Sequence, residues 1–131
     1  MVSKKLKNIL LLTMLLIAFH GIEENLAGFY AKDFFILYPS SFFNSIPATF
    51  YWTFHIMWWF LIVTGFLLIL GGKWTLRILA LFGIVYFFEL HHVVKGIIAG
   101  GYYPGMITGI AYPILGIFFW KELLKNMKGG D

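Results

Sequence analysis

The sequence of 131 residues contains no cysteine and little charge, since only 12% of its residues are Asp, Glu, Lys or Arg. Without cysteine the chain has no disulfide bonds and no thiolate ligands for a metal. Soluble domains are about 45–50% apolar and about 25% charged. This chain is 60% hydrophobic, with a mean hydropathy of +0.83. Because its apolar residues come in long blocks, the sequence predicts an integral membrane protein.

Four apolar blocks each approach the roughly 17–25 residues that a helix needs to cross the hydrocarbon core. We therefore predict an all-α membrane protein: a single transmembrane domain over residues 1–131 that forms a four-helix bundle. Residues 29–46 are aromatic and only partly polar, and Pro39 interrupts them, so they are predicted to form an interfacial or re-entrant segment between the first two helices. The predicted spans cover about residues 8–28, 48–71, 74–94 and 104–120.

The basic residues lie at the predicted helix ends, which is typical of the positive-inside rule and not of nucleic-acid binding. If both termini are cytoplasmic, only Lys32 and Lys95 of the ten Lys and Arg residues lie outside. This bias predicts that both termini face the cytoplasm. The basic start and the apolar stretch 9–19 also resemble a signal peptide, but Ala27 offers only a weak cleavage site.

All four histidines and three of the six acidic residues lie within the predicted spans. Ionisable groups inside a bilayer are costly, and they are usually paired, buried in the bundle and functional. At about 1.5 Å per residue, Glu23, His55 and His92 each lie roughly 22–27 Å from the basic residue that anchors their span. These residues therefore share one depth, which is the outer leaflet in the predicted orientation.

Three of these residues, His20, Glu23 and Glu24, stand at positions i, i+3 and i+4 and share one helix face. Glu89 and His92 are likewise three residues apart, and a Glu-x-x-His pair facing His and carboxylates is how helical bundles build di-iron and di-manganese centres. We predict that these five residues bind a divalent metal. Imidazole and carboxylate ligands without cysteine suit zinc, iron or manganese.

Other polar residues are predicted to lie beside this site. His91 points about a hundred degrees away from His92, so we favour His92 as the ligand, although the choice between them stays open. His55 would complete the metal shell or act as an acid/base, and Tyr102 would donate a proton or orient a substrate. We expect Tyr103 near the mouth of the same site.

Two short motifs suggest a family. Residues 20–24 read HGIEE, an H-x-x-E-E pattern, and residues 102–105 read YYPG, a Y-x-P-G pattern, with a histidine ahead of it at 91 or 92. In this combination and order they resemble the HXXEE-motif membrane proteins, a prokaryotic family without an assigned function. The resemblance runs from His20 to the last span. It implies that the motif residues are signature positions and that the protein lies in a prokaryotic cytoplasmic membrane, but it implies no reaction.

Several functions fit these patterns. We favour a metal-dependent enzyme that acts on a lipid or isoprenoid-like substrate, with the bilayer as its surroundings and no nucleic-acid partner. A metal-free acid/base isomerase is the second enzymatic hypothesis. Intramembrane Glu and His also mark ion paths, so a proton or metal-ion transporter or a subunit of a membrane complex is a third hypothesis. A structural role and a homo-oligomer stay open.

Overall fold

The computed structural model describes the backbone of residues 2–69 and 74–129 and the side chains of residues 2–58 and 74–129. Its regular elements within these ranges are helices, which make up 81% of the structure, so the all-α prediction is confirmed. In chain order they are α1 (Lys4–Leu26), the 3-10 helix η1 (Phe29–Ala31), α2 (Phe34–Phe42), α3 (Pro47–Ile69), α4 (Thr75–Phe82), α5 (Val85–Phe88), α6 (Leu90–Ala99), α7 (Met106–Gly109) and α8 (Ala111–Lys128).

Three helical stretches of the described chain are long and apolar enough to cross a membrane. They are α1, the succession α4–α6 over Thr75–Ala99 and the pair α7–α8 over Met106–Lys128. The predicted second span, about residues 48–71, corresponds to α3, but much of it lies outside the residues whose side chains are described. The predicted count of four spans and the single-domain boundary therefore stay predictions.

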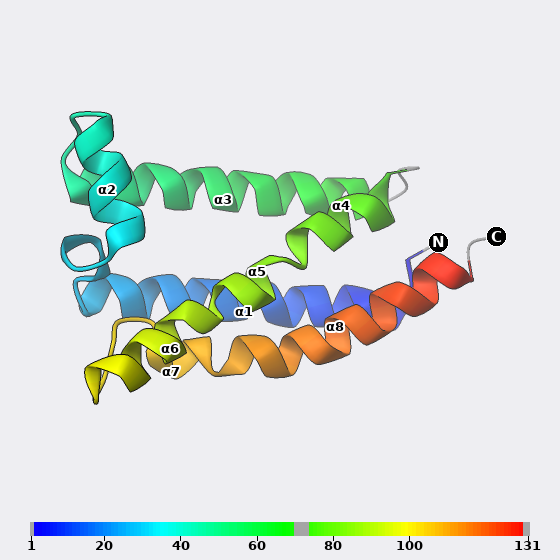
Figure 1. Ribbon diagram of the computed structural model, residues 1–131. Coiled ribbons are helices and arrows are strands. Elements are labelled where there is room, and N and C mark those ends of the chain that lie inside the picture. Colours follow the sequence, from blue (N-terminus) through cyan, green and yellow to red (C-terminus); the bar gives the residue numbers. More distant parts are fainter. Residues whose placement is uncertain (1, 70–73, 130–131) are drawn as a thin grey trace.

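The helices run along one long axis, with α2 lying across one end of the bundle (Figure 1). At the opposite end the start of α1 meets the end of α8. The backbone N–H of Ser3 donates to Asn126 Oδ1 at 2.7 Å, and the Ser3 hydroxyl donates to Glu122 Oε1 at 2.9 Å. The first and last helices thus share this end, which we call the terminal end. The predicted cytoplasmic location of this end stays a prediction.

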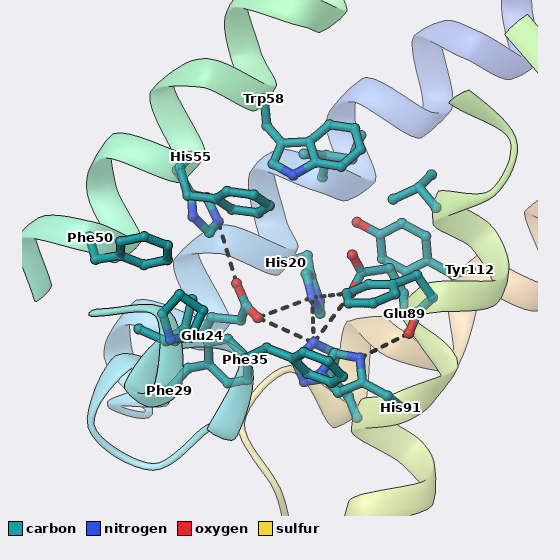
Figure 2. Close-up of a pocket in the computed structure, with 17 residues that line it drawn as sticks. His20, Glu24, Phe29, Phe35, Phe50, His55, Trp58, Glu89, His91 and Tyr112 are labelled. Carbon is teal, nitrogen blue, oxygen red and sulfur yellow. Dashed lines mark hydrogen bonds and ion pairs between the residues drawn. The ribbon is translucent and has the colours of Figure 1, made fainter. Parts of the chain in front are cut away.

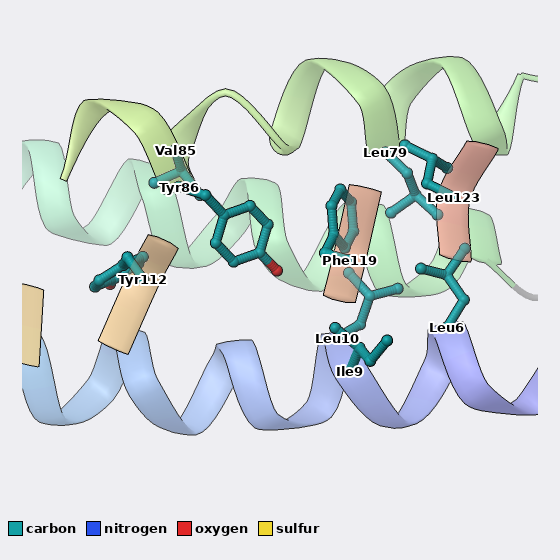
Figure 3. Close-up of a cluster of buried hydrophobic side chains, with 9 residues drawn as sticks. All are labelled: Leu6, Ile9, Leu10, Leu79, Val85, Tyr86, Tyr112, Phe119 and Leu123. Carbon is teal, nitrogen blue, oxygen red and sulfur yellow. The ribbon is translucent and has the colours of Figure 1, made fainter. Parts of the chain in front are cut away.

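An apolar core fills the half of the bundle near the terminal end (Figure 3). One polar pair lies inside this half, where Thr13 Oγ1 and the Tyr86 hydroxyl are 2.5 Å apart and Thr13 also donates to the Ile9 carbonyl at 2.8 Å. Each polar group of the pair therefore has a partner. The core residues come from α1, α4, α5 and α8: Leu6, Ile9, Leu10, Leu79, Val85, Tyr86, Tyr112, Phe119 and Leu123.

The stretch Thr75–Ala99 is broken twice, at Gly83–Ile84 and at Glu89. At the first break the helix lies against α8: a Cβ on Gly83 would approach the Phe119 ring to 2.7 Å and the Trp120 ring to 2.8 Å. The Trp120 indole N–H donates to the Gly83 carbonyl at 3.2 Å. The small residue permits close helix packing, as expected at membrane helix contacts.

The segment between α1 and α3 is held by one buried aspartate. Asp33 caps α2, because its Oδ1 accepts the Phe35 N–H at 2.8 Å, and its Oδ2 accepts Lys95 Nζ and the Tyr103 hydroxyl, each at 2.5 Å. Burial raises the pKa of Asp33, but the hydrogen bonds from Lys95, Tyr103 and Phe35 outweigh it and hold the pKa below its ordinary value. With nine residues α2 is too short to span a membrane. Whether the segment is interfacial or re-entrant stays a prediction.

Candidate metal centre

Two histidines and two glutamates meet in the half of the bundle near α2, with His20 and Glu24 from α1 and Glu89 and His92 from the start of α6 (Figure 2). His20 Nε2 lies 2.9 Å from Glu89 Oε2, and His92 Nε2 lies 3.2 Å from the same oxygen. The two Nε2 atoms are 3.3 Å apart. His20, Glu89 and His92 thus form a group whose ligand atoms are close enough together to hold one metal ion.

Glu24 is the fourth member of this group. Its Oε1 lies 3.2 Å from His92 Nε2 and 3.6 Å from His20 Nε2. Its other oxygen, Oε2, accepts the Tyr51 hydroxyl at 3.1 Å and lies 3.4 Å from His55 Nε2. We call His20, Glu24, Glu89 and His92 the His/Glu group. It is largely shielded from solvent, with His20 and Glu24 each 4% exposed and His92 1% exposed.

The backbone fixes which nitrogen of His92 faces the group. His92 Nδ1 lies 2.6 Å from the Pro104 carbonyl oxygen, which can only accept a hydrogen bond. Nδ1 therefore carries the hydrogen, and in the neutral ring Nε2 presents its lone pair to the other members. Histidines that bind metals commonly donate their second ring N–H to a carbonyl in this way.

The Thr108 hydroxyl and the Glu23 carboxylate fix the tautomer of His20 in the same way. The Thr108 hydroxyl lies 2.6 Å from His20 Nδ1 and 2.5 Å from Glu23 Oε2. The ionised carboxylate only accepts, so the single hydroxyl hydrogen of Thr108 goes to Glu23, and Thr108 accepts the N–H of His20. The Nε2 lone pair of His20 therefore also points into the His/Glu group.

The group consequently has many acceptors and few donors at its centre. Two imidazole lone pairs and carboxylate oxygens of Glu24 and Glu89 face one another within 2.9–3.6 Å. Buried acceptors that face only acceptors are unfavourable, and buried charges are normally paired or bound to metals. Shared protons or a cation must therefore lie between these atoms, and a divalent ion would balance the two carboxylate charges.

Glu23 lies beside the group but uses its carboxylate differently. It accepts four hydrogen bonds: from the Tyr102 hydroxyl and the Ile107 N–H at 3.0 Å, and from the Thr108 N–H at 2.8 Å and hydroxyl at 2.5 Å. These backbone N–H groups open α7, where Gly105 offers no capping side chain. Glu23 thus caps a helix from a distance. Its predicted role as a metal ligand stays a prediction.

Gly105 allows the chain to pass close to both histidines. Its φ of +81° is a conformation that other residues rarely adopt. A Cβ there would lie 2.7 Å from both His20 Cε1 and His92 Nδ1. The Y-x-P-G motif is therefore built against the H-x-x-E-E motif: Tyr102 bonds to Glu23, the Pro104 carbonyl orients His92, and Gly105 leaves room for both rings.

The remaining predicted site residues lie at different distances from the group. His55 borders it: its Nδ1 lies 3.2 Å from the Tyr51 carbonyl, which directs Nε2 toward Glu24. Tyr102 is 54% exposed, and its hydroxyl donates to Glu23 and not into the group. His55 thus lies beside the group and Tyr102 beside Glu23, and the catalytic roles of both stay predictions.

Of the two adjacent histidines, His92 belongs to the group and His91 lies outside it. His91 Nδ1 lies 2.8 Å from the Phe88 carbonyl oxygen, and its Nε2 is 3.8 Å from Asp33 Oδ2. Among the described residues this Nε2 has no hydrogen-bond partner although it is buried. His92 is thus the histidine of the pair that belongs to the group, and its role as a metal ligand stays a prediction.

A cavity of about 300 Å³ adjoins the His/Glu group. Figure 2 shows Phe50, His55 and Trp58 of α3 on one side and Glu24, His20 and Glu89 on the other. Most of its wall is apolar, and three rings at its edge are partly exposed: Phe54 (44%), Phe35 (46%) and Phe88 (49%). The cavity therefore combines one polar wall with an aromatic mouth at the side of the bundle.

Sequence reasoning missed three residues that shape this site. Thr108 orients His20, Tyr51 donates to Glu24, and Tyr112 lines the cavity. Thr108 alone carried a signal, because a hydroxyl in the first turn after Pro104 and Gly105 stands at the same depth as the predicted ligands. Tyr51 and Tyr112 read as ordinary aromatic residues of apolar helices.

Fold and site together define an all-helical protein with membrane-type helices and a buried His/Glu group that can hold a metal ion. A family model described as "Protein of unknown function with HXXEE motif" matches residues 11–119. The chain belongs to this family, as the motifs predicted. Comparison with curated proteins and with solved structures gave no match.

Proposed function

We propose that this protein is a membrane-embedded, metal-dependent enzyme that acts on a lipid-soluble substrate. The ligands are His20, Glu89 and His92, and Glu24, which lies beside both histidines, is a fourth ligand that water or a substrate oxygen would displace. The bound ion is zinc, iron or manganese, which suit imidazole and carboxylate. The site lies in the outer leaflet if the terminal end is cytoplasmic.

The spacing of the ligand atoms of His20, Glu89 and His92 carries this proposal. Ligands about 2.0–2.2 Å from a tetrahedral ion lie roughly 3.3–3.6 Å from one another. The three separations among His20 Nε2, His92 Nε2 and Glu89 Oε2 are 2.9, 3.2 and 3.3 Å. Glu24 Oε1 lies 3.2 Å from His92 Nε2 and 3.6 Å from His20 Nε2. The lone pairs of both histidines are turned inward by partners on Nδ1, so a cation needs little rearrangement to bind.

The other residues supply orientation and proton transfer. A divalent ion in such a site polarises a carbonyl or phosphoryl oxygen or activates water. His55 faces the cavity with its Nε2 beside Glu24 Oε2, so it can hold a proton next to a bound substrate. The apolar wall and the exposed rings at the cavity mouth favour a lipid or isoprenoid-like molecule that enters from the bilayer.

Elemental analysis tests the proposal. The protein is purified in detergent without chelator or nickel affinity and then incubated with Zn²⁺, Fe²⁺ or Mn²⁺ before dialysis. We expect near one metal per chain, lost in His92→Ala and in Glu24→Ala. Glu122→Gln is the matched control, because Glu122 is also a buried glutamate but lies at the terminal end. It should keep the metal.

A folded protein that takes up no metal contradicts the proposal. That result would favour the metal-free alternative, in which the His/Glu group shares protons and performs acid/base chemistry. Helix content from circular dichroism, measured on each variant, separates loss of ligands from loss of fold.

A further inference from the structure

Tyr112 has an unusual hydroxyl for a residue this deeply buried. The side chain is 1% exposed and belongs to the apolar core, yet it also lines the cavity. Among the residues that the structure describes, its hydroxyl has no hydrogen-bond partner. Figure 2 shows the hydroxyl directed into the cavity, toward the space between Trp58 and His20. A buried tyrosine hydroxyl usually finds a partner.

Tyr86 shows how the same kind of residue is normally satisfied in this bundle. Tyr86 is also 1% exposed and lies beside Tyr112, with ring centroids 6.3 Å apart. Its hydroxyl pairs with Thr13 at 2.5 Å. The fold can thus provide partners for buried phenols. Of the buried tyrosines among the described residues, Tyr51 and Tyr86 have hydroxyl partners, whereas Tyr112 has none and is turned toward the cavity.

Tyr112 also lies directly against the His/Glu group. Its ring meets the His20 ring edge to face, with centroids 5.2 Å apart. A molecule in the cavity would therefore meet a hydroxyl donor and the proposed metal on the same wall. The side of the cavity formed by α3 offers aromatic rings, including Phe50 and Trp58 (Figure 2).

We propose that the cavity binds a small apolar carbonyl compound, whose oxygen accepts a hydrogen bond from Tyr112 while it faces the metal centre. A carbonyl oxygen has two lone pairs, so it can accept from Tyr112 and approach a cation together. The cavity lies at the lower end of the range of about 300–1,000 Å³ for small-molecule sites, which favours a short chain or a single ring. The statement that the carbonyl oxygen faces a metal ion rests on the proposed function, whereas the hydrogen bond from Tyr112 does not.

Infrared spectroscopy of a carbonyl probe tests this inference. The probe is 2-undecanone labelled with ¹³C at its carbonyl, added to zinc-loaded protein in detergent. We expect a second carbonyl band at lower frequency than that of the ketone dissolved in micelles. Tyr112→Phe should bind zinc normally but shift the bound band toward the micellar value and weaken binding about 2- to 10-fold, as loss of one hydrogen bond predicts.

Two control variants and a chelator treatment separate the contribution of Tyr112 from those of the cavity and the metal. Tyr86→Phe removes a phenol of equal burial outside the cavity and should leave the shifted band unchanged. Ile17→Trp places a larger side chain in the cavity wall and should abolish the band. Chelator-treated protein should keep a smaller shift, which comes from Tyr112 alone.

Zinc-loaded protein with only the micellar band overturns the inference and leaves the metal centre intact. An identical bound band in Tyr112→Phe overturns the role of Tyr112. Protein that binds no zinc but shows a Tyr112-dependent band supports the carbonyl site while it contradicts the proposed metal centre.

Discussion

The two halves of this bundle, one near the terminal end and one near α2, differ in how their buried polar groups are paired. In the terminal half Thr13 pairs with Tyr86, and Glu122 accepts the Ser3 hydroxyl, so donors meet acceptors. In the half near α2, the Nε2 atoms of His20 and His92 face carboxylate oxygens, so in the neutral rings acceptors meet acceptors. The first arrangement is complete without any added group. The second requires protons or a cation, and it stands beside a cavity.

This difference separates structural from functional polarity in a membrane protein. Both halves contain buried charged or polar residues, so burial alone does not identify a site. What distinguishes the His/Glu group is that its outer partners, the Pro104 carbonyl and the Thr108 hydroxyl, consume the N–H groups of both rings. These partners leave the Nε2 lone pairs of His20 and His92 directed at the centre of the His/Glu group. In the half near the terminal end, the polar groups instead bond to one another.

The largest loss of stability should come from filling the space beside the His20 and His92 rings. Gly105→Ala combines a strained φ of +81° with a Cβ 2.7 Å from His20 and His92, whereas Gly28→Ala has a similar φ of +69° and nothing within 4 Å. Strain costs about 1–2 kcal/mol at each position. Overpacking should add about 1–3 kcal/mol at Gly105 only. Denaturation in mixed micelles measures the difference, and equal losses for both variants would contradict the close contact.

A smaller effect should follow from removing one outer partner. Thr108→Val keeps the shape of the side chain but leaves His20 Nδ1 without its acceptor. Losing such a partner typically weakens metal binding about 10- to 100-fold. Competition with a chelator measures the affinity. Thr53→Val, which removes a hydroxyl bonded only to the Thr49 carbonyl, should leave the affinity unchanged; an unchanged affinity in Thr108→Val as well would refute the orienting role.

The smallest effect should come from the terminal half. Tyr86→Phe deletes the hydrogen bond to Thr13, which keeps its bond to the Ile9 carbonyl. Hydrogen bonds between membrane helices average about 0.6 kcal/mol, so unfolding in mixed micelles should change by about this amount. The metal content should not change. A loss of metal in this variant would mean that the two halves are not independent.

Local rules explain how much of this was predictable from the sequence. Helical periodicity and rise per residue placed His20, Glu24, Glu89 and His92 at one depth, because both depend only on spacing within a helix. They also grouped Glu23 with the ligands, since i, i+3 and i+4 share a face. The start of α7 against that face, where Glu23 caps it, depends on how two helices cross.

The same limit applies to aromatic residues of the apolar helices. Tyr112 reads as a core aromatic because the sequence does not reveal that α3 stands away from it across a cavity. Likewise the break at Gly83–Ile84 and the short helix α2 depend on tertiary contacts, such as Trp120 with Gly83 and Lys95 with Asp33. Spacing within one helix therefore predicts depth and face, but not which neighbour a side chain meets.

X-ray absorption at the metal edge tests the central claim most directly, using protein that has been loaded with zinc in detergent. The account predicts one zinc per chain with nitrogen and oxygen neighbours only, Zn–N distances of about 2.0–2.1 Å and outer-shell scattering from two imidazole rings. His92→Ala should remove one of these rings. Zinc without imidazole scattering, or folded protein that binds no metal, would contradict the account.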